Sequence, residues 1–161
     1  MKNLLVVLSF LLPATTSVVW AGEWEDGYAA YERQDYITAV RKWRIVAERG
    51  DRSGQSILGS MYAQGQGVPQ DYFIAVKWYR LAAAQGEIKA QYKLGFMYAN
   101  GQGVPRDFVR SYMWSYLAAI AGHPEAARVR DLAEKSLNLD QFSTAKKLAL
   151  GCQQRKFQDC N

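Results

Sequence analysis

The sequence of 161 residues has few of the side chains that build catalytic and metal sites. It contains one histidine, His123, and two cysteines, Cys152 and Cys160, so a complete set of zinc ligands is missing. The carboxylates are scattered, and no nucleophile is tied to a base by its spacing. We therefore expect a protein without catalytic residues, cofactor or metal, which is to say no enzyme.

Proline, blocks of like charge and long apolar runs are scarce as well. Four prolines in a chain that is 49% hydrophobic and 22% charged exclude low-complexity disorder and indicate a folded protein. The 20 basic and 15 acidic residues are dispersed. Without a cluster of basic residues, nothing points to nucleic-acid binding.

The N-terminus holds the one long apolar run. Lys2 precedes the apolar residues 4–12, Pro13 follows them, and the small Ala21 ends the segment. This order predicts a secretory signal peptide, residues 1–21, that is cleaved after Ala21. An uncleaved anchor is the alternative, but the run is too short to span a bilayer. We expect an exported, periplasmic protein with no transmembrane segment after cleavage.

The two cysteines are expected to pair in an oxidising compartment. Eight residues of α-helix would hold Cys152 and Cys160 about 12 Å apart, whereas a disulfide needs Cα atoms within about 7 Å. The helix before them should therefore end near Gly151, and residues 155–159 should fold back. The closed tail, residues 152–161, either caps the apolar end of the last helix pair or presents a basic contact.

The central part of the chain is an internal repeat. Residues 58–86 and 94–122 align with a shift of 36 residues and are identical at 16 of 29 positions, including the string GQGVP at 65–69 and 101–105. The string lacks the preceding strand and the following Lys-Ser/Thr of a phosphate-binding loop. We interpret it as a joint between two helices, in which glycines allow a tight turn and proline leads into the next helix.

Each repeat predicts an antiparallel helix pair. Apolar residues at three- and four-residue spacing predict a first helix over about 88–99, which Gly101 ends. Asp71 and Asp107 are expected to cap the second helix of each pair. Gly86 is expected to end the helix that Asp71 begins.

Altered units flank the two repeats. Residues 22–50 form a shorter unit, in which Tyr31 takes the place of Tyr62 and the joint is five residues shorter. After the repeats, residues 124–135 predict one helix, and Asn138 with Gln141 predicts a capping box for a last helix that runs to about Leu150. The prediction is an all-α protein, an α-solenoid of about four helix pairs, with units 22–50, 51–86, 87–122 and 123–151.

The order Leu-Gly-x-x-Tyr, Gly-x-Gly-Val-Pro-x-Asp, Trp and Ala-Ala-x-x-Gly over about residues 53–122 resembles the Sel1-like repeat, a relative of the tetratricopeptide repeat. The first unit is closer to the tetratricopeptide type. The resemblance implies a solenoid that binds other proteins, often in envelope assembly or signalling, and implies no particular reaction. Some cysteine-rich members bind penicillin, but the repeats of this chain have no cysteine.

Aromatic residues that break the repeat are the best candidates for a binding site. Trp78, Trp114, Tyr62 and Tyr98 recur with the period and are expected in the core. Tyr92 and Phe96 stand where the preceding repeat has serines. The resemblance places one face of each first helix in a concave groove. That face comprises Ser53, Ser56, Ser60, Gln64, Lys89, Tyr92, Phe96 and Asn100. Alternatively, Tyr92 and Phe96 pack between units.

His123 lies where the other units begin their first helix, which favours a neutral or capping role. The function we expect is that of a periplasmic adaptor that binds a protein or peptide in the groove. A purely structural scaffold is a second possibility, and the oligomeric state stays open. A third is an envelope protein that binds or hydrolyses a cell-wall ligand, although Ser60 and Ser136 lack the Ser-x-x-Lys motif.

Overall fold

A computed structural model describes residues 16–157 and residue 160, with side chains from residue 22 onward. This part of the chain contains eight α-helices and no strand. The helices are α1 (Thr16–Glu32), α2 (Tyr36–Glu48), α3 (Arg52–Gln64), α4 (Tyr72–Ala83), α5 (Ile88–Asn100), α6 (Phe108–Ile120), α7 (Ala126–Lys135) and α8 (Leu139–Gln154). Most of the predicted signal peptide lies outside the described residues, and its end, with Ala21, falls within α1.

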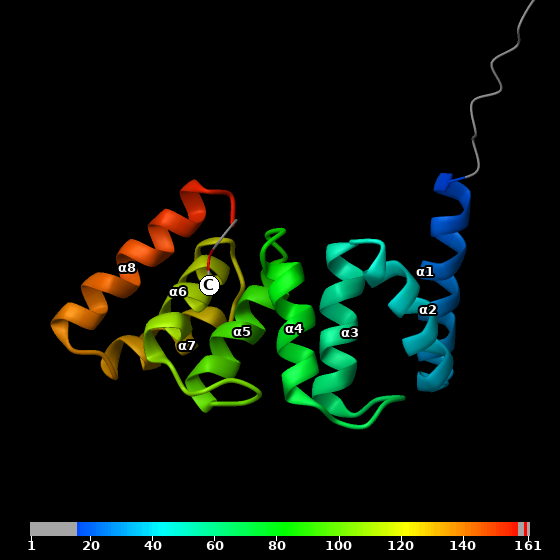
Figure 1. Ribbon diagram of the computed structural model, residues 1–161, viewed down its shortest axis with the longest axis horizontal. Helices are drawn as coiled ribbons and strands as arrows, with labels where there is room; N and C mark the ends of the chain where they lie inside the picture. The colour runs from blue at the N-terminus through cyan, green and yellow to red at the C-terminus, as the bar shows by residue number, and fades with distance from the viewer. Residues whose placement is uncertain (1–15, 158–159, 161) are drawn as a thin grey trace, which may run out of the picture.

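The array runs from α1 and α2 at one end, through α3, α4 and α5, to α8 at the other end (Figure 1). Consecutive helices pack on each other from α1 through α7, and α8 packs against α6. The architecture is an all-α solenoid, as predicted. No helix among the described residues combines the length and the apolar character that crossing a membrane requires.

Acidic side chains begin most of the helices. Asp71 and Asp107 accept hydrogen bonds from the backbone N–H of the third helical residue, both at 2.9 Å. Asp35, Asp51 and Glu87 make the same contact at the starts of α2, α3 and α5. Each satisfies a donor that the helix cannot pair internally and stabilises it by about 1 kcal/mol. The two predicted aspartate caps are confirmed.

The GQGVP segments are joints, and they also stack one unit on the next. Gly65 and Gly101 end their helices in the left-handed conformation. Gly67 and Gly103 also have positive φ, and a Cβ there would overlap the carbonyl oxygens of Tyr36 and Tyr72 respectively. Those carbonyls belong to the first residues of α2 and α4. The second glycine therefore lets each joint lie directly on the second helix of the preceding unit.

The recurring tyrosines lie in the core and link neighbouring units. Tyr62 and Tyr98 are 8% and 3% exposed. Arg44 on α2 donates to the Tyr62 hydroxyl at 2.7 Å, and Arg80 on α4 donates to Tyr98 at 2.6 Å. Both bonds join the second helix of one unit to the first helix of the next. Of the recurring tryptophans, Trp114 is buried, whereas Trp78 is half-buried at the edge of the core.

The first unit has a different register from the one expected. Asp35 N–H bonds to the carbonyl of Ala30, whereas Asp71 N–H bonds to that of Tyr62. Ala30, and not Tyr31, thus occupies the place of Tyr62, and the joint is four residues shorter instead of five. The packing of the glycines supports the same register, because Gly27 lies against Trp43 in the first unit as Gly59 lies against Tyr79 in the next. The expected register was wrong because two adjacent residues, Ala30 and Tyr31, both fit the spacing of this position.

The helices near the C-terminus differ from expectation at their ends. The helix predicted from residue 124 begins at Ala126, because a turn that bonds Ala126 N–H to the His123 carbonyl precedes it. The capping box of Asn138 and Gln141 is confirmed. Helices α6, α7 and α8 share a small second core around Tyr112.

The disulfide between Cys152 and Cys160 is present, with Cα atoms 5.2 Å apart. The expected helix end near Gly151 is wrong, since α8 continues to Gln154. Left-handed conformations at Lys156 and Phe157 reverse the chain beyond the helix instead. The Phe157 ring packs against Gly86, and Cys160 belongs to the main core. The tail therefore returns to the turn between α4 and α5.

Candidate functional site

The predicted groove residues gather in two separate hollows. Ser53 and Lys89 line a hollow of about 350 Å³ at the starts of α3 and α5, which we name the turn hollow. Ser60, Gln64 and Phe96 line a second one of about 200 Å³, the Phe96 hollow. The other three residues line neither of them.

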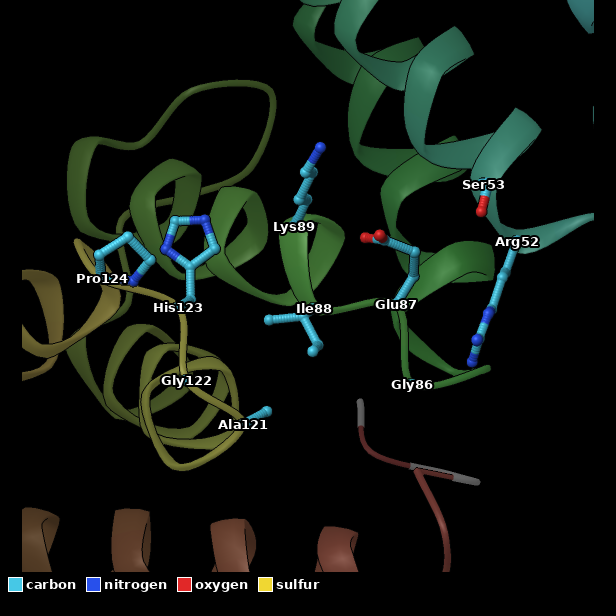
Figure 2. Close-up of a pocket in the computed structure, with 10 residues that line it drawn as sticks. All are labelled: Arg52, Ser53, Gly86, Glu87, Ile88, Lys89, Ala121, Gly122, His123 and Pro124. Atoms are coloured by element: carbon cyan, nitrogen blue, oxygen red, sulfur yellow. The ribbon is translucent and has the colours of Figure 1, made fainter.

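The turn hollow contains charged groups that do not converge. Glu87 caps α5 and also accepts a hydrogen bond from the buried Ser56 hydroxyl at 3.3 Å. Lys89 projects away from Arg52, which points toward the other end of the hollow (Figure 2). Arg52 donates to the carbonyl of Gln85 at 3.3 Å. Glu87 and Arg52 are held by contacts with the fold, and the three charged groups do not form a constellation of acid, base and nucleophile.

His123 borders the turn hollow and stacks on Tyr92. The two rings lie 4.2 Å apart between centroids at an angle of 18°. Nδ1 of His123 is 3.1 Å from Glu125 Oε2, an ion-pair distance without the geometry of a hydrogen bond. A capping role for His123 is wrong, since α7 begins three residues later without a side-chain cap. The histidine instead joins the second repeat to the C-terminal helices.

The Phe96 hollow has a small polar floor and an aromatic rim. Phe96 is 41% exposed, although it is a large apolar side chain. Gln64 Nε2 donates to Ser60 Oγ, and Ser60 also bonds to the buried Tyr79 hydroxyl. Burial raises the pKa of Tyr79 to about 12, and the bond with Ser60 opposes part of the rise. The tyrosine is thus neutral at physiological pH and holds Ser60 in place.

A third hollow, of about 240 Å³, lies on the other side of Ser60, between α1, α2 and α3. We name it the Tyr28 hollow. Tyr28, Trp43 and Ile57 line it, and Tyr28 is 59% exposed. Ser60 lines both hollows, so they are neighbours on the surface, and we call the two together the groove.

The corrected register explains this arrangement. The positions held by Tyr28, Ser60 and Phe96 in α1, α3 and α5 are equivalent, so the groove has an aromatic residue on each side of a serine. Sequence reasoning missed Tyr28, because the register of the first unit was off by one residue. The signal that would have found it is Gly27, which matches Gly59 and Gly95.

The remaining predicted groove residues have contacts within the chain. Ser56 is buried under Glu87, and Asn100 is exposed and donates to the carbonyl of Phe96 in its own helix at 2.8 Å. Ser136, considered for the hydrolytic alternative, bonds to the carbonyl of Leu132 at 3.0 Å. No three His, Cys, Asp or Glu side chains come together as a metal site within the described ranges.

Stacked helix pairs with periodic caps and glycine joints define a helical-repeat protein of the α-solenoid class. The family model named Sel1 repeat matches residues 53–87 and 88–123. A Sel1 repeat protein from Oxalobacter formigenes is 33% identical, with a TM-score of 0.64 over 71% of this chain and 90% of that one. The chain belongs to the Sel1 repeat family.

A second solved structure is similar over more of the chain. It is c5321, a protective antigen present in uropathogenic Escherichia coli strains that displays the SLR fold, with 28% identity, a TM-score of 0.79 and 88% of this chain covered. This chain spans 31% of the length of c5321. No curated protein matches the sequence. The fold is typical of scaffolds for protein–protein interaction, and family members are generally non-catalytic.

Proposed function

We infer that this protein is a periplasmic adaptor that binds a segment of a partner protein in the groove across α1, α3 and α5. The observation that carries this is the meeting of the Phe96 hollow and the Tyr28 hollow at Ser60. An open row of first helices offers a long and pre-organised surface, which suits an extended segment.

The groove favours apolar residues in the partner. Tyr28 and Phe96 are 59% and 41% exposed, and aromatic side chains of this kind are frequent anchors of protein interfaces. Ser60 lies between them and is small, so it leaves room on both sides. The ligand is therefore a segment with two apolar side chains, one for each hollow, that crosses Ser60.

An exported location rests on two features. The chain has only two cysteines, and they form a disulfide, which persists in oxidising compartments such as the periplasm. The predicted signal peptide agrees with this location. N-terminal sequencing of protein purified from a bacterial periplasm should begin at Gly22, and a protein retained in the cytoplasm would contradict it.

The groove can be tested with displayed peptides selected on the purified protein. Selected peptides should contain two apolar residues. Phe96→Ser or Tyr28→Ser should lower the affinity for these peptides by about tenfold or more. Both replacements copy the residue at the equivalent position, Ser60, and affect exposed side chains.

Ile120→Ser serves as a control, because it removes a similarly exposed apolar side chain outside the groove. Equal binding of the selected peptides to all three variants would exclude the groove as the site.

A further inference from the structure

A hollow of about 310 Å³ lies on the opposite side of α5 from the groove, and three arginines line it: Arg80, Arg106 and Arg110. Tyr98 contributes to it as well, and Phe96 belongs to the groove. Phe96 and Tyr98 are two positions apart on α5, and side chains two positions apart on a helix point in directions that differ by about 200°. This arginine hollow is therefore independent of the proposed peptide site.

Two of the three arginines lie at the ring of Tyr98. The guanidinium carbons of Arg80 and Arg110 lie 5.9 and 6.0 Å from the centroid of Tyr98. Arg80 also donates to the Tyr98 hydroxyl at 2.6 Å, which holds its side chain in the wall of the hollow. Arg106 lies on the exposed rim, with its guanidinium 5.6 Å from the ring of Phe108.

The hollow carries an excess of positive charge. Asp107 is the one carboxylate in its lining. Its Oδ1 caps α6, and its Oδ2 accepts from Arg110 Nη1 at 2.6 Å. Within the described residues, no carboxylate forms an ion pair with Arg80 or Arg106. Two guanidinium groups are thus without a counter-charge in the part of the chain that the structure describes.

A comparison with the preceding repeat shows which of these arginines accompany helix stacking. Its Arg44 bonds to Tyr62 just as Arg80 bonds to Tyr98. Where the second repeat has Arg106 and Arg110, however, the first has Gln70 and Ile74. The arginine–tyrosine bond accompanies stacking in both units, whereas the two additional arginines occur in one of them. Stacking therefore does not account for Arg106 and Arg110.

We propose that the arginine hollow is a binding site for an oxyanion group, either a carboxylate or a phosphate. Guanidinium groups present paired N–H donors that match two oxygens of such a group. Arg80 and Arg106 supply the donors, and Arg110, which is paired with Asp107, borders them. The same chemistry serves a carboxylate of a protein partner and a phosphate ester, so the probes must distinguish these two.

The test is a titration of the purified protein with inorganic phosphate and, separately, with glutarate, followed by NMR of the arginine side-chain N–H groups. We expect saturable shifts with a Kd on the order of 1 mM for at least one probe. Tighter binding of phosphate assigns the site to phosphate esters, and tighter binding of glutarate assigns it to carboxylates.

Matched variants connect the binding to the hollow. Arg106→Gln with Arg110→Ile installs the residues of the preceding repeat and should weaken binding about tenfold or more. The reciprocal pair, Gln70→Arg with Ile74→Arg, should create a second saturable site near Arg44. Lys146→Gln with Lys147→Gln removes the same charge from α8 and should leave the Kd unchanged. Shifts that do not saturate, or an equal loss in the lysine variant, would overturn the proposal.

Discussion

Tyr92 and His123 form a nearly parallel stack, with ring centroids 4.2 Å apart, although 31 positions separate them in the chain. This pair joins α5 to the turn before α7. Tyr92 was selected from the sequence as a groove residue, and it has an aromatic partner within the chain. Phe96 lies one helical turn further along α5. It is exposed and lines the groove, whereas Tyr92 does not.

The first prediction concerns this stack. Tyr92→Ser and His123→Ala should each lower the free energy of unfolding, because each removes one ring of the pair. The coupling between them should be about 0.5–1.5 kcal/mol, measured by urea denaturation of both single variants and the double variant. Strictly additive effects would show that the two rings do not stabilise each other.

The second prediction concerns the joint. Gly67→Ala should destabilise the protein by about 2 kcal/mol or more, because it combines a positive φ with overlap of its Cβ and the Tyr36 carbonyl oxygen. Gly50→Ala is the matched control, since Gly50 also has a positive φ but no atom within 4 Å of the added Cβ. In thermal unfolding, Gly67→Ala should lower the melting temperature clearly more than Gly50→Ala does. Equal losses would mean that strain alone matters and that the close stacking is not required.

The third prediction concerns the tail. Cys152→Ser with Cys160→Ser should lower the free energy of unfolding by about 2–3 kcal/mol, because the unfolded chain regains the freedom of an open loop. The open tail also no longer holds Phe157 on Gly86. Phe157→Ala in the oxidised protein should account for part of this loss. Urea denaturation with and without reductant measures both effects. A reductant that leaves the midpoint of the wild-type protein unchanged would refute the stabilising role.

The fourth prediction concerns pH. Burial raises the pKa of Tyr79 to about 12 from a model-compound value of 10.0. Between these two values the unfolded chain loses the Tyr79 proton before the folded chain does. Its contribution to stability is therefore complete below pH 10 and declines as the pH rises toward 12.

Urea denaturation at a series of alkaline pH values checks this slope. Tyr79→Phe should make the decline shallower, since phenylalanine does not ionise. A slope that is the same in wild type and variant would contradict the assigned pKa.

Much of the architecture was predictable from sequence because it depends on local interactions. Asp71 and Asp107 cap their helices through donors only three residues away. Gly65 and Gly101 end helices because glycine adopts positive φ without a steric penalty. Such features recur wherever the residues recur, so the 36-residue period led directly to the unit and from the unit to the solenoid.

The candidate site was predictable in part. The exposure of Phe96 and its neighbourhood with Ser60 and Gln64 followed from helical spacing and from the resemblance to the family. Tyr28 was missed, because the shorter joint of the first unit hid its register. The arginine hollow was missed as well, since Arg80 and Arg106 come from different segments and meet only in the folded chain.

The sequence by itself determined the repeat, the caps, the glycine joints and the pairing of the two cysteines, since each follows from spacing and from the conformational preferences of single residues. Tertiary structure alone decided which residues meet: Tyr92 with His123, Phe157 with Gly86, and three arginines with Tyr98 in one hollow. The physical reason is that helix stacking brings together side chains far apart in the chain, and no local pattern records how those surfaces meet.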